Sequence, residues 1–152
     1  MLKQRISLQS VPGAYEVLRR VEEYVHNSGL EPSLLTLAKM RASQINGCAF
    51  CLDMHSKEAR KLGETEQRLY LLNAWRESPL YTERERAALA WTEALTLISE
   101  THAPDEVYEQ ARAQFSEKEL VDLSTAIGMI NLWNRLVIGF RVQHPVVTAK
   151  AA

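Results

Sequence analysis

The chain contains 152 residues, 46% of them hydrophobic and 24% charged, and its formal net charge is −1 at pH 7. This composition is typical of a globular domain that buries a core without disulfide bonds or structural metals. The 18 Lys and Arg residues balance 19 Asp and Glu residues, so no overall field attracts nucleic acid or an anionic membrane. We therefore expect neither a nucleic acid nor a membrane as a partner.

The sequence shows no export or membrane signal. Residues 1–10 lack the apolar core of a signal peptide, and two cysteines are too few for a secreted disulfide framework. The most apolar segment, 120–140, is interrupted by Asp122, Asn131 and Asn134, so it is not predicted to span a membrane. We therefore expect a cytoplasmic protein.

Apolar residues recur at helical spacing along the chain, between breaks made by Pro, Gly and capping residues. Capping boxes are predicted at Thr82 with Glu85 and at Ser116 with Glu119. No segment shows the alternation of apolar and polar residues that is typical of a β-strand. We expect an all-α fold of about seven helices and a single domain over residues 1–152. The helices are predicted at 14–27, 32–45, 48–63, 65–77, 82–98, 104–114 and 116–143.

The two cysteines are the informative feature. They are Cys48 and Cys51, and His55 follows four residues later. At about 100° per residue, Cys51 lies about 60° and His55 about 20° from Cys48 around a helix, so the three can meet in one site. Cysteines at i and i+3 of a helix have Cα atoms about 5 Å apart, which permits reversible disulfide formation. The spacing predicts a redox-capable pair.

Each thiol has a neighbour that favours its thiolate. Cys48 is expected in the first turn of a helix, where free backbone N–H groups and the helix dipole stabilise an anion. His55 lies one turn beyond Cys51 and can accept its proton directly or through a water molecule. A thiolate that attacks a peroxide becomes a sulfenic acid, and a second thiol three residues away can condense with it. Lys39 and Arg41 could add positive charge, although a plain surface role is the commoner one for such residues.

Two other interpretations stay open at this point. The cysteines could pack as small apolar residues beside an unrelated histidine. Alternatively, Cys48, Cys51 and His55 could bind zinc with a fourth ligand from His26, His102 or His144. The chain lacks the second ligand cluster that structural zinc sites usually have, so we expect no metal.

The segment Gln44–Cys51, sequence QINGCAFC, followed by His55 in a leucine-rich helical context, resembles the CxxCxxxH motif of the AhpD-like alkylhydroperoxidase and carboxymuconolactone decarboxylase family. The resemblance is strongest over residues 34–99. It implies an all-α AhpD-like fold, homo-oligomers such as dimers, trimers or hexamers, and reduction of a hydroperoxide substrate by thiols. It also implies an external dithiol reductant and no bound cofactor.

The resemblance assigns the peroxide-attacking thiol to Cys51, the resolving and more exposed thiol to Cys48, and the proton acceptor to His55. AhpD-type members carry a Glu twelve positions before the first cysteine, where this chain has Thr36. A Thr hydroxyl is no carboxylate base at neutral pH, so another acid must replace the Glu or turnover is weak. The candidates for this acid are Glu58, Glu85 and Glu93. Some members also place a histidine at the position of Phe50.

These features predict a thiol-dependent hydroperoxide reductase that uses a CxxC redox pair. The alternatives are a redox latch in a binding or sensor protein, or a general disulfide oxidoreductase with little peroxidase turnover. The decarboxylase branch is a weaker match, because its members need not carry the cysteine pair.

Two further expectations concern packing. Segment 120–140 is apolar nearly all round, which predicts that one of its faces is covered by another subunit. The large aromatic residues could line a substrate pocket, but core positions are the commoner role. They are Tyr15, Tyr70, Trp75, Tyr81, Trp91, Trp133 and Phe140.

Overall fold

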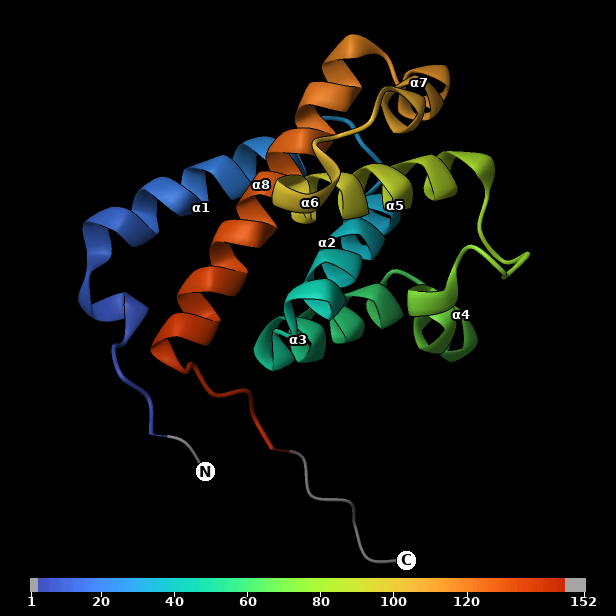
Figure 1. The fold of residues 1–152 in the computed structure, drawn as a ribbon. Coiled ribbons are helices and arrows are strands. Elements are labelled where there is room, and N and C mark those ends of the chain that lie inside the picture. The colour runs from blue at the N-terminus through green and yellow to red at the C-terminus, as the bar shows by residue number, and fades with distance from the viewer. Residues whose placement is uncertain (1–2, 147–152) are drawn as a thin grey trace, which may run out of the picture.

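A computed structural model describes residues 3–146, which form eight α-helices, two 3-10 helices and no strand (Figure 1). This confirms the all-α fold predicted from the sequence. The elements are η1 Leu8–Ser10, α1 Pro12–His26, α2 Pro32–Asn46, α3 Ala49–Lys61, α4 Glu66–Leu71, η2 Leu72–Ala74, α5 Glu83–Thr96, α6 Ile98–Thr101, α7 Asp105–Gln114 and α8 Glu117–Phe140.

The helix boundaries follow the local chemistry of the sequence. Both predicted capping boxes are present: Thr82 and Ser116 each accept a hydrogen bond from the backbone N–H three residues on, at the starts of α5 and α8. Pro32 occupies the first turn of α2, where its missing N–H costs nothing. Gly47 ends α2 with φ of 69°, a left-handed conformation that suits glycine.

Three differences from the predicted helices have local causes. The last helix ends at Phe140 and not at Gln143, because Arg141 adopts φ of 55° and caps it. The segment expected as a loop before Pro104 contains the short helix α6. The helix expected over 65–77 is divided into α4 and η2. Among residues 3–146 there are therefore eight α-helices and not the seven predicted.

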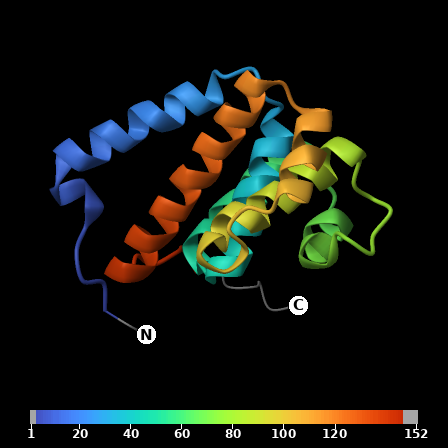
Figure 2. The ribbon, with the colours of Figure 1, turned by 45° about the horizontal axis from the view of Figure 1, so that its top comes forward.

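Helix α2 is central to the packing. It contacts α3, α5 and α8, whereas α1 packs mainly against α8 and lies beside it at the edge of the molecule (Figure 2). The N-terminal segment reaches the far end of α8, where the Arg5 N–H donates to the Phe140 carbonyl at 2.9 Å. Because α1 does not pack closely on α3, a space lined by side chains separates these two helices.

The aromatic residues divide between core and cleft. Trp75 and Trp91 are buried in two separate clusters of the hydrophobic core, as expected. Tyr70 is 72% exposed and belongs to neither. Tyr15 and Trp133 instead line the space beside α1, with their rings 6.0 Å apart in an edge-to-face arrangement.

Within residues 3–146, no helix is long and apolar enough to cross a membrane.

Candidate functional site

The site is built around the short turn that joins α2 to α3. Its two residues are Gly47 and Cys48, and the Cys48 N–H donates to the Ser43 carbonyl at 3.0 Å. Cys48 is the N-cap of α3, where its sulfur accepts a hydrogen bond from the Cys51 N–H at 3.4 Å. Cys48 and Cys51 form a disulfide, with their Cα atoms 5.4 Å apart. The helix therefore begins at one member of the pair and carries the other in its first turn.

Buried amides hold this turn against α8. The Asn46 amide donates to the side-chain oxygens of Asn131 and Asn134 at 3.0 and 2.9 Å. Asn134 is fully buried and donates in turn to the Ser43 hydroxyl at 3.1 Å. In the sequence, Asn131 and Asn134 stand out only as interruptions of an apolar helix. That interruption was the signal for their role, because amides in an apolar helix need buried partners.

His55 lies one turn beyond Cys51 and is 5% exposed. Its Nδ1 atom is 2.8 Å from Oε2 of Glu58. The hydrogen bond from His55 lowers the pKa of the Glu58 carboxyl, which opposes the effect of its partial burial. An ionised carboxylate can only accept, so Nδ1 of His55 donates this hydrogen bond and Nε2 is not used in it.

Of the three acids proposed to replace the missing Glu, only Glu58 is placed beside His55. Glu85 binds the guanidinium of Arg68, and Glu93 binds that of Arg41. The Thr36 hydroxyl donates to the Pro32 carbonyl of its own helix at 2.8 Å. Thr36 is therefore satisfied by local backbone, and the carboxylate partner of the histidine comes from α3 itself.

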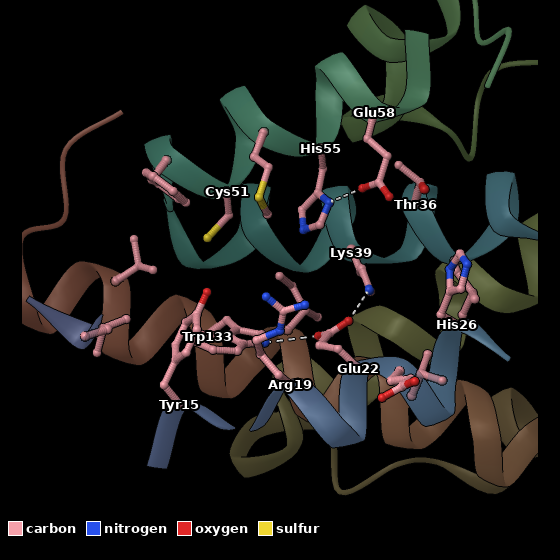
Figure 3. Close-up of a pocket in the computed structure, with 18 of the residues that line it drawn as sticks. Tyr15, Arg19, Glu22, His26, Thr36, Lys39, Cys51, His55, Glu58 and Trp133 are labelled. Atoms are coloured by element: carbon pink, nitrogen blue, oxygen red, sulfur yellow. Dashed lines mark hydrogen bonds and ion pairs between the residues drawn. The ribbon is translucent and has the colours of Figure 1, made fainter. Parts of the chain in front are cut away.

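Cys51, His55, Glu58 and Thr36 line a cleft of about 810 Å³ (Figure 3). Helices α2 and α3 form one side of the cleft and α1 forms the other, and α8 contributes Trp133. Figure 3 shows the side chains of Cys51 and His55 directed from α3 into this space. The structure thus brings two of the three predicted site residues to one cavity wall, and the third is bonded to Cys51.

The expectation that Cys48 is the more exposed thiol is wrong for this structure. Cys48 is 0% exposed and Cys51 1%, and of the two only Cys51 lines the cleft. The cause is the turn itself. It packs Cys48 against Ala42, Ile130 and Val137, so the N-cap faces the protein interior.

Of the two cations considered from the sequence, Lys39 lines the cleft and Arg41 does not. Lys39 lines the cleft and forms a salt bridge of 2.7 Å with Glu22 of α1. Glu22 also accepts a hydrogen bond from Trp133 Nε1 at 3.0 Å. Arg41 lies outside the cleft lining and pairs with Glu93. Glu22 was missed by the sequence analysis, because nothing local in α1 indicates which glutamate faces α2.

The zinc ligand set is not assembled in the part of the chain that the structure describes, where no group of three or more His, Cys, Asp or Glu residues could hold a metal ion. His26 lines the cleft, whereas His102 and His144 are exposed residues that do not line it.

The sequence is similar to those of known proteins. Residues 12–94 match the model of the carboxymuconolactone decarboxylase family. The uncharacterized protein YdfG of Bacillus subtilis (strain 168) is 44% identical over 138 residues, which cover 90% of this chain and 94% of YdfG.

Solved structures share the fold. A protein of unknown function from Agrobacterium tumefaciens, provisionally described as the antioxidant defence protein AhpD, is 53% identical with a TM-score of 0.93. The match covers 95% of this chain and 100% of that one. An uncharacterized peroxidase-related protein with an AhpD core, from Ralstonia eutropha JMP134, is 15% identical with a TM-score of 0.77. That match covers 88% of this chain and 72% of that one, and it concerns the fold alone. On the family match and the shared fold, the chain belongs to the carboxymuconolactone decarboxylase family and has the AhpD-like fold.

Proposed function

We propose that this protein is a thiol-dependent hydroperoxide reductase, in which Cys51 attacks the peroxide, Cys48 resolves the product and His55 accepts the proton. The observation that carries the proposal is the wall of the cleft, where Cys51 and the His55–Glu58 pair lie on one face of α3. Only Cys51 of the two cysteines lines the cleft, which supports its role as the thiol that meets the substrate.

In the reduced protein, His55 Nε2 takes the proton of the Cys51 thiol, and Glu58 stabilises the positive imidazolium. The Cys51 thiolate attacks an oxygen of the hydroperoxide, and the O–O bond breaks. Sulfur gains a hydroxyl group as sulfenic acid, and the departing alkoxide takes the proton from His55 to become an alcohol. The peroxide is reduced by two electrons and Cys51 is oxidised by two.

The Cys48 thiol then attacks the sulfenic sulfur, which releases water and forms the Cys48–Cys51 disulfide. An external dithiol reduces this disulfide by two successive thiol–disulfide exchanges and leaves as its own disulfide. This returns both cysteines to thiols and balances the two electrons that the peroxide received.

The experiment measures hydroperoxide consumption at the expense of dithiothreitol, together with free thiols before and after one equivalent of peroxide. We expect the wild type to lose two thiols together and to turn over repeatedly. Cys51→Ser should consume no peroxide, and without dithiothreitol Cys48→Ser should stop at a sulfenic acid that dimedone traps on Cys51. Full turnover by Cys51→Ser, or no dimedone adduct on Cys51 in Cys48→Ser, contradicts the mechanism. Paired thiol loss without repeated turnover would favour a redox latch instead.

We further propose that the protein acts in the cytoplasm as a homo-oligomer. Val121 and Leu132 on α8 are 64% and 37% exposed. Eleven residues separate them, so at about 100° per residue they share one stripe of the helix. This exposed apolar stripe supports contact with a second copy. Sedimentation analysis should show that Leu132→Asp reduces the assembly to smaller species, and an unchanged assembly contradicts this use of α8.

A further inference from the structure

We infer that the cleft selects an organic hydroperoxide that carries a carboxylate, with its apolar body near Cys51 and its carboxylate held by Arg19 of α1. This inference rests on the proposed function and adds to it a substrate class.

The size of the cleft indicates an organic molecule. Its volume of about 810 Å³ lies in the range of sites for small organic ligands, about 300–1,000 Å³. A water molecule occupies about 30 Å³ of liquid, and hydrogen peroxide has only one oxygen atom more. The space beside Cys51 is therefore much larger than hydrogen peroxide requires.

The wall around Cys51 is apolar. Cys51 belongs to a buried cluster with Ile130 and Val137, against which Phe50 and Trp133 pack. All four of these neighbours also line the cleft. Burial of hydrocarbon against such a surface contributes about 25 cal/mol per Å². The apolar part of a substrate is therefore expected on the side of the cleft that holds the reacting sulfur.

The opposite wall is polar and comes from one stripe of α1. Tyr15, Arg19, Glu22 and His26 follow the i, i+4, i+7, i+11 spacing of a single helix face, and all four line the cleft. Figure 3 shows these side chains extending from α1 into the space. A ligand that spans the cleft meets hydrocarbon at α3 and α8 and hydrogen-bonding groups at α1.

The ion pairs of the cleft leave the two arginines of α1 without partners. Lys39 is neutralised by Glu22, and Glu58 is engaged by His55. Among residues 3–146, neither Arg19 nor Arg20 has an ion-pair or side-chain hydrogen-bond partner, although both line the cleft. The guanidinium groups of these two arginines are therefore free to bind a ligand in the cleft.

Glu23 is the remaining cleft carboxylate, and it too has no ion-pair partner among the described residues. Two unpaired guanidinium groups and one unpaired carboxylate line the cleft, so at least one guanidinium is available to a ligand. Arg19 is on the same stripe as Tyr15, one turn away, so a guanidinium fork and a phenol can bind one carboxylate together. This pairing of donors is the reason for assigning the carboxylate to Arg19.

The experiment compares linoleic acid 13-hydroperoxide with its methyl ester, both below their micelle concentrations. The ester keeps the hydrocarbon and the peroxide but lacks the charge. We expect Arg19→Gln to lower kcat/KM for the acid about fivefold and to leave the ester unchanged. Glu23→Gln should raise kcat/KM for the acid. Lys61→Gln, which removes a charge on α3 outside the cleft lining, is the matched control and should change neither.

A second measurement does not require turnover. Calorimetry on the disulfide form compares binding of 13-hydroxylinoleic acid with binding of its methyl ester. Tighter binding of the acid, lost in Arg19→Gln, supports the inference even if no hydroperoxide is consumed, which would count against the proposed function alone. Equal binding of acid and ester, or equal effects of Arg19→Gln on both, overturns the inference while the peroxidase proposal stands.

Discussion

Glu58 lies one turn beyond His55 on the same helix, and its carboxylate oxygen is 2.8 Å from the histidine Nδ1. The AhpD-type pattern takes this carboxylate from the preceding helix, at the position that Thr36 occupies here. A pair at i and i+3 brings the two side chains together without help from another element. The histidine and its acid therefore move as one unit with α3 and with Cys51.

We predict that Glu58→Gln slows the reaction of Cys51 with peroxide about tenfold at pH 7, because the amide cannot stabilise a positive imidazolium. The loss should be smaller at pH 9, where the thiol ionises without a base. Stopped-flow consumption of peroxide by the reduced protein measures both rates. Glu109→Gln, at an exposed position of α7, is the matched control. An equal loss at both pH values would indicate a general structural effect and contradict this positioning role.

Cys48 is expected to stabilise α3 as well as to react. Cys48→Ser and Cys48→Ala both abolish the disulfide, but only serine keeps an atom that accepts the Cys51 N–H. We predict that the alanine variant is about 1 kcal/mol less stable than the serine variant, the usual value of an N-cap. Urea unfolding under the same conditions gives this difference directly. Equal stabilities would mean that the capping hydrogen bond contributes nothing.

The amides beneath the turn should contribute strongly to stability. Asn134→Ala removes one of the two acceptors of the Asn46 amide, at 2.9 Å, and the donor to the Ser43 hydroxyl, at 3.1 Å. We predict a loss of about 2–3 kcal/mol in the free energy of unfolding, because the buried Ser43 hydroxyl loses its donor and the amide network loses its central member. Asn73→Ala, at an exposed position of η2, should change it by less than about 0.5 kcal/mol. A loss for Asn134→Ala as small as that of the control would contradict the anchoring role.

Acid should destabilise the contacts made by Arg84, which binds Glu31 at the start of α2 and Glu119 in the first turn of α8. The hydrogen bond from Arg84 lowers the pKa of Glu31. The Ser116 backbone N–H, followed by Arg84, lowers the pKa of Glu119 from 4.5 to about 2. Because these folded pKa values are below the unfolded ones, the stabilisation is present above pH 4.5 and is lost as pH falls toward 2.

Urea unfolding at pH 6, 4 and 3 measures this dependence. In Arg84→Met the free energy of unfolding should depend less on pH, because the lowered pKa of Glu31 is caused chiefly by the Arg84 guanidinium. The capping hydrogen bond of Glu119 remains in that variant, so part of the dependence should survive. An unchanged pH profile in Arg84→Met would show that these ion pairs do not govern acid stability.

The sequence predicted the helices well where short-range chemistry decides them, as at the two capping boxes and at Gly47. It failed at Arg141, because a left-handed residue other than glycine leaves no local signal. The prediction of one domain over residues 1–152 is not tested by the helices and stays a prediction.

For the site, the spacing of Cys48, Cys51 and His55 predicted that they lie close together, because local helix geometry decides this; their catalytic roles stay a proposal. The acid could not be chosen among Glu58, Glu85 and Glu93, since that choice depends on which arginines capture the other two. The burial of Cys48 was mispredicted for a similar reason. It depends on α8, which lies about eighty residues further along the chain.

The connection between α2 and α3 consists of Gly47 and Cys48 alone. This short connection limits where residues can be inserted or deleted without disrupting the site. One residue added between Cys51 and His55 would turn the histidine by about 100° around the helix and out of the cleft. One added before Cys48 would separate the cap from the amides that anchor Asn46. Insertions and deletions are therefore expected to be excluded from Ser43 to Glu58.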